Sequence, residues 1–236
     1  MTTPLVVAID GPSGSGKSSV SRAVARRLGL AYLDTGAMYR AATWWCLQEG
    51  AALTDTGAVA DLVRRMPLEM GLDPAAPSVH VAGVDAATAI RETWVSEAVS
   101  ALATNLACRA ELGRRQRDLI EAECAPGGFS GGRGVVAEGR DITTVVAPDA
   151  DVRVLLTADP DARLARRARE VHGSDSAAAV EATRDQVLRR DADDSTVVEF
   201  HQAAAGVVTV DSSHLDLAQT VDAVLDVVAA VTGHRA

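Results

Sequence analysis

The chain has 236 residues, of which 47% are hydrophobic and 23% are charged, as in an ordinary globular protein with one large domain or a domain carrying an insertion. Its formal net charge of −9 argues against a general nucleic-acid or anionic-membrane binder, since those partners require a positive surface. Three separated cysteines and five scattered histidines show neither a disulfide framework nor zinc-ligand spacing. With no signal peptide and no membrane-spanning run, these features predict a cytoplasmic protein.

The first predicted element is an apolar strand, Leu5–Ile9, followed by a glycine-rich loop and a helix from Val20 to Leu30. This layout is typical of a P-loop, in which backbone N–H groups and a helix N-terminus surround phosphate oxygens. Lys17 is expected to reach the β- and γ-phosphates and the Ser18 hydroxyl to ligate Mg²⁺. Lys17 is also the only lysine beside 22 arginines, and a guanidinium does not replace an ammonium in a tight loop. The residues predicted to hold ATP here are Gly11, Pro12, Ser13, Gly14, Ser15, Gly16, Lys17, Ser18 and Ser19.

A short strand, Ala31–Leu33, runs into the segment Asp-Thr-Gly-Ala-Met-Tyr-Arg at residues 34–40. A helix that begins near Ala37 would make Thr35 its N-cap and would put Tyr39 and Arg40 in its first turns. The segment is then a second place to bind an anion. An ordinary capped helix with a solvated Arg40 is the alternative, and the local sequence leaves both open.

The next part of the chain predicts a small inserted unit. Helical patterning continues to about Met66, after which two short alternating runs, 68–72 and 78–83, flank a proline-rich turn and predict a β-hairpin. A third strand is expected near 89–90, and helical periodicity returns from 94 to 124.

The most glycine-dense segment, 126–134, precedes a strand at 135–137 and lacks Gly-Lys-Ser. We therefore interpret it as a mobile surface connection and not as a second nucleotide loop. Glu138, Arg140 and Asp141 follow the strand, and ligands of parallel α/β sheets gather beyond the carboxyl ends of strands. These three side chains are therefore expected near the P-loop.

A fourth strand, 152–156, leads into a helix that carries Arg163, Arg166 and Arg167 at i, i+3 and i+4. Like charges at this spacing oppose helix formation by roughly a few tenths of a kcal/mol per pair, which favours an anionic partner over a merely solvated face.

The rest of the chain continues the alternation of helices and strands. A helix from 177 to 190, a fifth strand at 207–210 and a closing helix from 215 to 231 are predicted. Strands separated by helices predict an α/β fold, a parallel sheet with helices on both faces.

A P-loop alone leaves GTP switches, motor ATPases and small-molecule kinases open. The single asparagine, Asn105, precedes a leucine, so the guanine-binding Asn-Lys-x-Asp element is missing. The many arginines favour a kinase whose acceptor is itself a phosphate, because two polyanions must be neutralised at close range. Such an acceptor attacks without a general base, whereas an alcohol would call for a carboxylate such as Asp34.

The motifs at 9–18, 34–40 and 138–141 together resemble those of the bacterial cytidylate kinases, and Arg114–Arg117 and Arg190–Thr196 match in order. The resemblance covers nearly the whole chain. It implies a P-loop NTPase fold with a five-stranded parallel sheet, a nucleoside-monophosphate-binding insert with a small antiparallel β element, and a short arginine-rich lid. The expected boundaries are 1–37 and 118–236 for the core, about 159–173 for the lid, 38–117 for the insert and about 67–92 for its β unit.

The resemblance also implies an activity, the transfer of the ATP γ-phosphoryl to CMP or dCMP in pyrimidine metabolism, with Mg²⁺, by a monomer that binds neither nucleic acid nor membrane. The implied CMP-binding residues are Thr35, Tyr39, Arg40, Ser100, Arg109, Arg140, Asp141, Arg190 and Asp194. The implied catalytic residues are Lys17, Arg140, Arg163 and Arg167, with Arg166 on ATP, Ser18 on Mg²⁺ and Glu138 on Mg²⁺ through water.

Three features depart from the family pattern. Glu138 stands where aspartate is common, the stretch 127–134 is longer than expected, and Val197 stands where an arginine is usual. A P-loop kinase of another small metabolite stays open as an alternative. Val197 motivates a third hypothesis, a nucleotide-binding protein with impaired catalysis.

Overall fold

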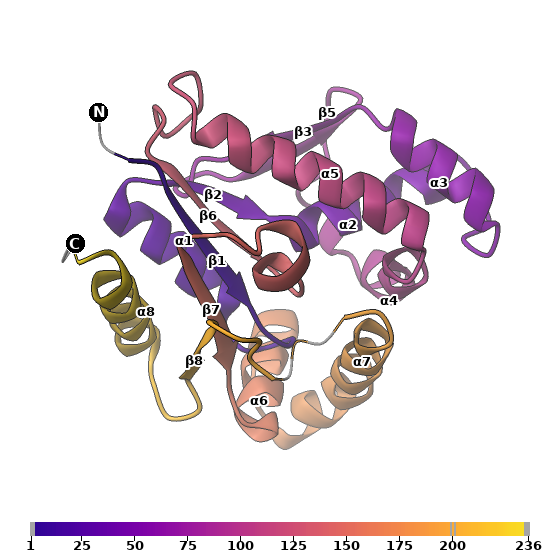
Figure 1. The fold of residues 1–236 in the computed structure, drawn as a ribbon. Helices are drawn as coiled ribbons and strands as arrows, with labels where there is room; N and C mark the ends of the chain where they lie inside the picture. Colours follow the sequence, from indigo (N-terminus) through magenta and orange to yellow (C-terminus); the bar gives the residue numbers. More distant parts are fainter. Residues whose placement is uncertain (1–2, 199, 201, 234–236) are drawn as a thin grey trace.

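The computed structural model describes residues 3–198, 200 and 202–233, except for the side chains of residues 185, 186, 190 and 194. Its centre is a five-stranded parallel sheet in the order β2-β6-β1-β7-β8 (Figure 1). The strands are β1 (Leu5–Asp10), β2 (Ala31–Asp34), β6 (Gly134–Gly139), β7 (Val152–Thr157) and β8 (Val208–Asp211). The predicted parallel sheet is confirmed, each strand lying within two residues of its expected position.

Helices cover both faces of this sheet, as the alternation of strands and helices predicts. Side chains of β1 alternate between the faces: Val7 and Ile9 pack with helices α1 (Lys17–Leu28) and α8 (Leu217–Thr232), whereas Ala8 belongs to the cluster on the opposite face. The strand is buried on both sides because parallel sheets are covered by their crossover helices.

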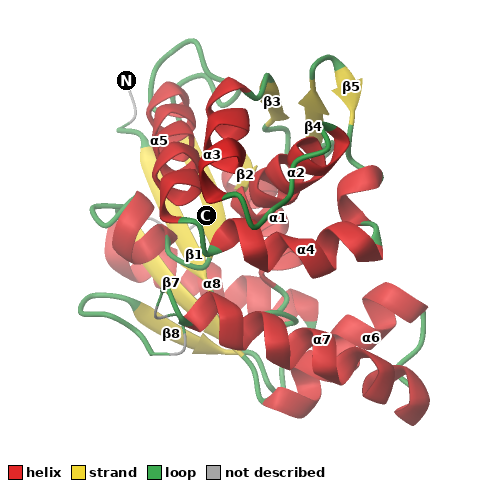
Figure 2. Cartoon of the chain, turned by 90° about the vertical axis from the view of Figure 1, so that its right-hand side faces the viewer, coloured by secondary structure: helices red, strands yellow, loops and turns green. Residues whose placement is uncertain are grey.

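A second hydrophobic cluster lies outside the sheet, in the segment between β2 and β6. It joins α2 (Thr35–Gln48), α3 (Thr56–Arg65), α4 (Thr93–Ala103) and α5 (Leu106–Glu123) to a small antiparallel sheet (Figure 2). The small sheet contains β3 (Leu68–Gly71), β4 (Ser78–Val81) and β5 (Val84–Asp85). The hairpin is confirmed, but the third strand was predicted too late in the chain.

That third strand, expected near residues 89–90, is a 3₁₀ turn (Ala89–Arg91). The tight turn at Ala82 and Gly83, both with positive φ, lets β5 pair directly with β4. The long helix expected from 94 to 124 is two helices. Asn105 separates them because its side chain accepts hydrogen bonds from the backbone N–H groups of Ala107 (3.1 Å) and Cys108 (3.3 Å).

The glycine-rich connection leads from α5 to β6, as predicted. Its turn is hydrogen-bonded: the Glu123 carboxylate accepts from the backbone N–H groups of Phe129 and Ser130, both at 2.8 Å. Gly134 ends it with φ +111°, where a Cβ would lie 2.0 Å from the Leu5 carbonyl oxygen. That the connection is mobile stays a prediction.

Helices α6 (Pro160–His172) and α7 (Ala177–Ser195) form an antiparallel pair beyond the sheet (Figure 2). Helix α7 continues past residue 190, where the sequence predicts its end, so Asp191 lies inside the helix. This extension places Asp191 against the loop that follows β1.

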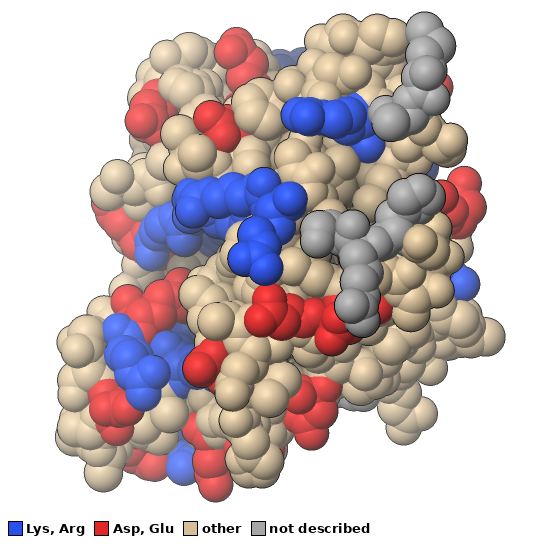
Figure 3. Space-filling model, turned by 90° about the vertical axis from the view of Figure 1, so that its left-hand side faces the viewer, with Lys and Arg blue, Asp and Glu red and all other residues tan. Residues whose placement is uncertain are grey.

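The charged surface shows no broad basic field on the face drawn in Figure 3. On the described part of that face, basic side chains form one central band and smaller patches, with acidic side chains around them. Among the described residues, no helix combines the length and apolar character that a bilayer crossing requires.

Candidate active site

The loop between β1 and α1 has the backbone of a phosphate cradle. Gly14 and Gly16 take positive φ angles of +76° and +90°, and no described residue outside the local backbone comes within 4 Å of where a Cβ of Gly16 would stand. Gly16 is the N-cap of α1 and supplies no side-chain cap, whereas α2, α6 and α8 are each capped by an aspartate. The first turn of α1 therefore presents N–H groups that suit an anion.

Lys17 lies over this loop. Its ammonium donates to the Pro12 carbonyl oxygen at 2.9 Å, which bends the side chain back across the cradle. Ser15 supports the same interpretation, because its hydroxyl oxygen is buried and has no hydrogen-bond partner among the described residues. An anionic ligand in the cradle would satisfy such polar groups.

A buried carboxylate lies beside the start of α1. Glu138 on β6 is 3% exposed, and the Tyr32 hydroxyl donates to its Oε1 at 2.6 Å. Burial raises the pKa of Glu138 and the Asp34 carboxylate raises it further, while Lys17 and the Ser18 and Tyr32 hydroxyls oppose the shift. Burial also raises the pKa of Tyr32, so its phenol stays a donor.

These oxygens fit Mg²⁺, which prefers oxygen ligands and commonly binds through one or two protein groups together with phosphates and water. Within the described ranges, no group of three His, Cys, Asp or Glu side chains could hold a metal ion. Ser18 and Glu138 would therefore hold Mg²⁺ only together with the bound phosphates.

The P-loop opens into a cleft of about 820 Å³. The cleft joins the loop to the start of α2, the region before α4, the end of β6 and helix α6. The predicted site residues among its lining are Ser13, Gly14, Gly16, Lys17, Ser18, Ser19, Arg40, Glu138, Arg140 and Arg167. Arg91 and Trp94 also line the cleft, and no sequence motif identifies them.

The N-cap of α2 is Asp34 and not Thr35, which corrects the prediction. Asp34 accepts from the backbone N–H of Ala37 at 2.7 Å and from the Arg40 Nη2 at 3.2 Å. A carboxylate has two oxygens and a negative charge, so it can cap the helix and form an ion pair at once, whereas a hydroxyl is uncharged and forms no ion pair. Thr35 is the first helical residue, and its hydroxyl donates to the Glu138 carbonyl oxygen at 2.7 Å. Arg40 Nε is buried without a partner among the described residues and could donate to an anion.

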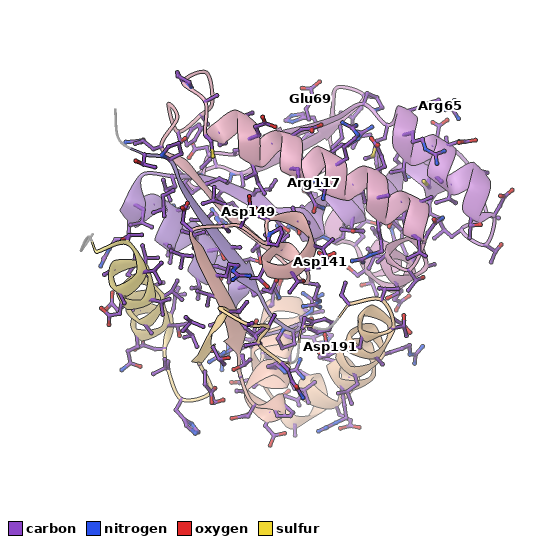
Figure 4. All side chains as sticks on the ribbon, in the orientation of Figure 1. Arg65, Glu69, Arg117, Asp141, Asp149 and Asp191 are labelled. Carbon is purple, nitrogen blue, oxygen red and sulfur yellow. The ribbon has the colours of Figure 1, made fainter. Side chains whose placement is uncertain are left out.

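Arg109 and Asp141 are brought together from α5 and the end of β6. Arg109 donates through Nη2 to Asp141 and through Nη1 to the Ala103 carbonyl oxygen at 3.2 Å, at the end of the helix that carries Ser100. Asp10 holds the same loop, because its carboxylate accepts from the backbone N–H groups of residues 142 (2.9 Å) and 143 (2.8 Å). Figure 4 shows Asp141 just below the π-helical turn at 142–146.

Arg140 and Arg163 meet at one carboxylate, that of Asp191. Arg163 donates to the Ser13 carbonyl oxygen at 3.0 Å and to Asp191, and Arg140 donates to the Gly11 carbonyl oxygen and to Asp191 at 3.3 Å. The residue pattern around Asp191 was noticed in the sequence, but no role was predicted for it. The ring of Phe200, also missed, lies 4.8 Å from the Arg140 guanidinium carbon, and nothing in the sequence pattern identifies it.

Arg163, Arg166 and Arg167, three of the four arginines on α6, reach different partners. Arg166 donates to the Ser212 carbonyl oxygen at 2.6 Å and lines a second cavity of about 570 Å³ beside Gly14 and Leu217. Arg167 lines the main cleft and pairs with Glu170 at 3.0 Å. Two arginines on the same face of α6 therefore line different cavities, Arg166 the second cavity and Arg167 the main cleft.

The cytidylate kinase family model matches residues 7–230. The chain belongs to the cytidylate kinase family. It is 45% identical to a cytidylate kinase of Streptomyces avermitilis, over 95% of this chain and 92% of that protein. It is 47% identical to that of Cutibacterium acnes, over 96% of this chain and 97% of that protein. The cytidylate kinase of Rhodococcus jostii is 45% identical, with 98% of each chain covered.

Membership of the cytidylate kinase family confirms the resemblance seen in the sequence, and with it the P-loop NTPase fold and the class of enzyme, an ATP-dependent kinase. The role of each site residue stays a prediction. The side chains of Arg190 and Asp194, predicted to contact CMP, lie outside the described part of the structure. Tyr39 is partly buried at the edge of the second hydrophobic cluster.

Proposed function

We propose that this protein transfers the γ-phosphoryl of ATP to CMP or dCMP, giving CDP or dCDP. The observation that carries the proposal is the cleft of about 820 Å³ in which the P-loop, Arg40 and Arg140 face one space. That volume lies in the range of small-molecule sites, and the family supplies the chemistry.

The described residues would act mainly by positioning and neutralising charge. Phosphoryl transfer has little covalent chemistry for the protein to perform, so cations aimed at the developing charge are the main requirement. Lys17, Arg140 and Arg167 border the cleft from three different segments. The acceptor phosphate is largely dianionic at neutral pH, its second pKa being about 6, and attacks without a general base.

Mg²⁺, when bound, would offset charge on the β- and γ-phosphates, and Ser18 and Glu138 are the residues that would hold it. Glu138 is kept in place by the Tyr32 hydroxyl, 2.6 Å from its Oε1. The N–H groups of α1 would bind the phosphates of ATP, and Arg166, which lines the second cavity, would contact the nucleoside end.

Asp141 and Arg109 would read the cytosine, together with Ser100. The exocyclic amine of cytosine needs an acceptor, which the Asp141 carboxylate provides, and Arg109 fixes that carboxylate from α5. Thr35, Tyr39 and Arg40 would lie toward the acceptor phosphate with Arg140, and Arg190 and Asp194 toward the ribose.

We also propose that the enzyme works as a monomer in the cytoplasm. All three cysteines lie within the described residues and are free thiols, as a reducing compartment favours. Gel filtration with light scattering would test the monomer.

The test is ADP release in a coupled assay with CMP, dCMP, UMP, AMP or shikimate as the acceptor. We expect turnover with CMP or dCMP at least tenfold above the other three. A preference for UMP, AMP or shikimate would overturn the assigned acceptor. Nucleotide binding without transfer to any acceptor would instead support the hypothesis of impaired catalysis that Val197 motivates. Lys17→Met is the control for turnover by a contaminating kinase.

A further inference from the structure

Asp191 closes a ring of hydrogen bonds around the first turn of the P-loop. Its Oδ1 accepts from the Ser13 backbone N–H at 3.1 Å and from Arg140 at 3.3 Å, and its Oδ2 accepts from Arg163. Both arginines also donate to the P-loop backbone, Arg140 to Gly11 and Arg163 to Ser13. Figure 4 shows Asp191 on α7, beside the sheet.

The ring lies away from bulk water. The side chains of Asp191 and Arg163 are 6% and 9% exposed, and that of Arg140 is 16% exposed. In such surroundings a charged hydrogen bond is stronger than in water, and removal of one partner leaves the others poorly compensated. The two guanidiniums would repel each other without the carboxylate between them.

We propose that Asp191 is a positioning residue for phosphoryl transfer, which holds Arg140 and Arg163 against the P-loop at the place where charge develops on the transferred group. The inference rests on the proposed kinase function. It gives α7 a role in catalysis, because one carboxylate on that helix accepts hydrogen bonds from the P-loop, the end of β6 and α6.

The effect on rate follows from geometry. Aspartate and asparagine have nearly the same shape, but the amide carries no charge and has one acceptor oxygen in place of two. Asp191→Asn therefore leaves at least one arginine without its partner. A catalytic group displaced by about 1 Å can lower the rate about 100-fold, so we expect kcat to fall 10- to 100-fold.

The effect on nucleotide affinity should be opposite or small. Loss of a negative charge beside the phosphate site favours a polyanionic ligand, so we expect the Kd of ATP to stay within threefold of the wild-type value or to decrease. A merely structural role would weaken binding and turnover together. The separation of kcat from Kd is therefore the informative readout.

The matched control is Glu181→Gln, which removes the same charge from the same helix. Glu181 is 74% exposed at its side chain and pairs only at the surface with Arg184, at 3.1 Å. We expect it to leave kcat, the Kd of ATP and the melting temperature unchanged. Asp191→Glu keeps the charge on a longer side chain and should recover part of the lost kcat.

A second readout does not depend on the acceptor. Hydrogen–deuterium exchange of a peptide that spans the P-loop should be at least threefold faster in Asp191→Asn than in Glu181→Gln, because Ser13 loses its carboxylate acceptor. If wild-type protein transfers nothing to CMP, the proposed function fails, while the exchange experiment still tests the contact of Asp191 with the loop.

Unchanged kcat in Asp191→Asn, or unchanged P-loop exchange, would overturn the inference. A parallel loss of kcat and ATP affinity would also overturn it in favour of a structural role. If Asp191→Asn does not fold, Asp191→Glu decides, because a positioning role predicts a lower kcat with an unchanged Kd for ATP.

Discussion

Substitution of Gly14 by alanine would test whether the P-loop and helix α6 are in direct contact in solution. A Cβ at Gly14 would lie 2.4 Å from the Arg163 carbonyl oxygen, about 1 Å closer than an ordinary van der Waals contact. The obstacle is the backbone of α6, so no side-chain rotation relieves it. Either the P-loop or the helix must move.

The magnitude can be worked out against a matched control, Gly16→Ala. Both glycines have positive φ, +76° and +90°, so alanine costs about 1–2 kcal/mol of backbone strain at either position. The lower chain entropy of the unfolded alanine variants is common to both and cancels. Only Gly14 adds overpacking, worth about 1–3 kcal/mol, because no described residue outside the local backbone comes within 4 Å of a Cβ at Gly16.

The assay is urea unfolding followed by far-UV circular dichroism, in the absence of nucleotide so that ligand binding does not contribute. We expect Gly14→Ala to lose about 1–3 kcal/mol more unfolding free energy than Gly16→Ala. Equal losses would refute the reasoning, since they would mean that α6 does not press on the P-loop in the free protein.

Three further substitutions test other parts of the molecule. Asp141→Ala should lower kcat/KM for CMP by 100-fold or more while the Kd of ATP, measured by competition, changes less than threefold. Equal losses in kcat/KM for CMP and in ATP affinity would mean that Asp141 has a structural role. Tyr32→Phe removes the 2.6 Å hydrogen bond to Glu138, so the Mg²⁺ concentration that gives half-maximal activity should rise several-fold. The affinity for nucleotide in EDTA should stay unchanged. Hydrogen bonds from Arg114 lower the pKa of Glu111 to about 2, so Glu111 stabilises the fold above pH 4.5 and loses this contribution as the pH falls toward 2. The unfolding free energy of Glu111→Gln should therefore be lower than that of the wild type by up to about 1 kcal/mol at pH 7, and the difference should shrink below pH 4.5; a constant difference would contradict the shift.

The strands and the P-loop could be predicted from the sequence because their signals are local. An apolar run before Gly-Lys-Ser and a helix after it fix the path of the backbone almost alone, and every parallel strand was found. The third strand of the small sheet could not be placed, because Val84–Asp85 is only two residues long. Its position depends on the turn before it and not on a pattern of its own.

Arg163, Arg166 and Arg167 on α6 show a different limit. Their i, i+3 and i+4 spacing correctly predicts neighbouring positions, but long side chains from one face can reach carbonyl groups in several segments. Arg166 finds Ser212 in the loop after β8, which is remote in sequence. Asp191 was missed for the same reason, since its partners come from three separate segments.

The N-cap of α2 could not be assigned from the sequence alone. Asp34 and Thr35 are both good cap residues, and the sequence does not say which one leaves the strand. The structure decides it through Arg40, because a carboxylate at the cap also pairs with the guanidinium six residues later. Thr35 then turns inward to Glu138.

The acidic net charge of −9 and the binding of polyanions are compatible because several acids hold arginines in place. Arg40 pairs with Asp34, and Arg140 and Arg163 both pair with Asp191. Each pair lowers the local positive charge and so lowers ground-state affinity for phosphates. Each also fixes a guanidinium before the substrate arrives, and donors that are already in place stabilise the transition state without reorganisation. Removal of these acids should therefore separate affinity from rate: phosphate binding becomes stronger or stays the same, and turnover falls.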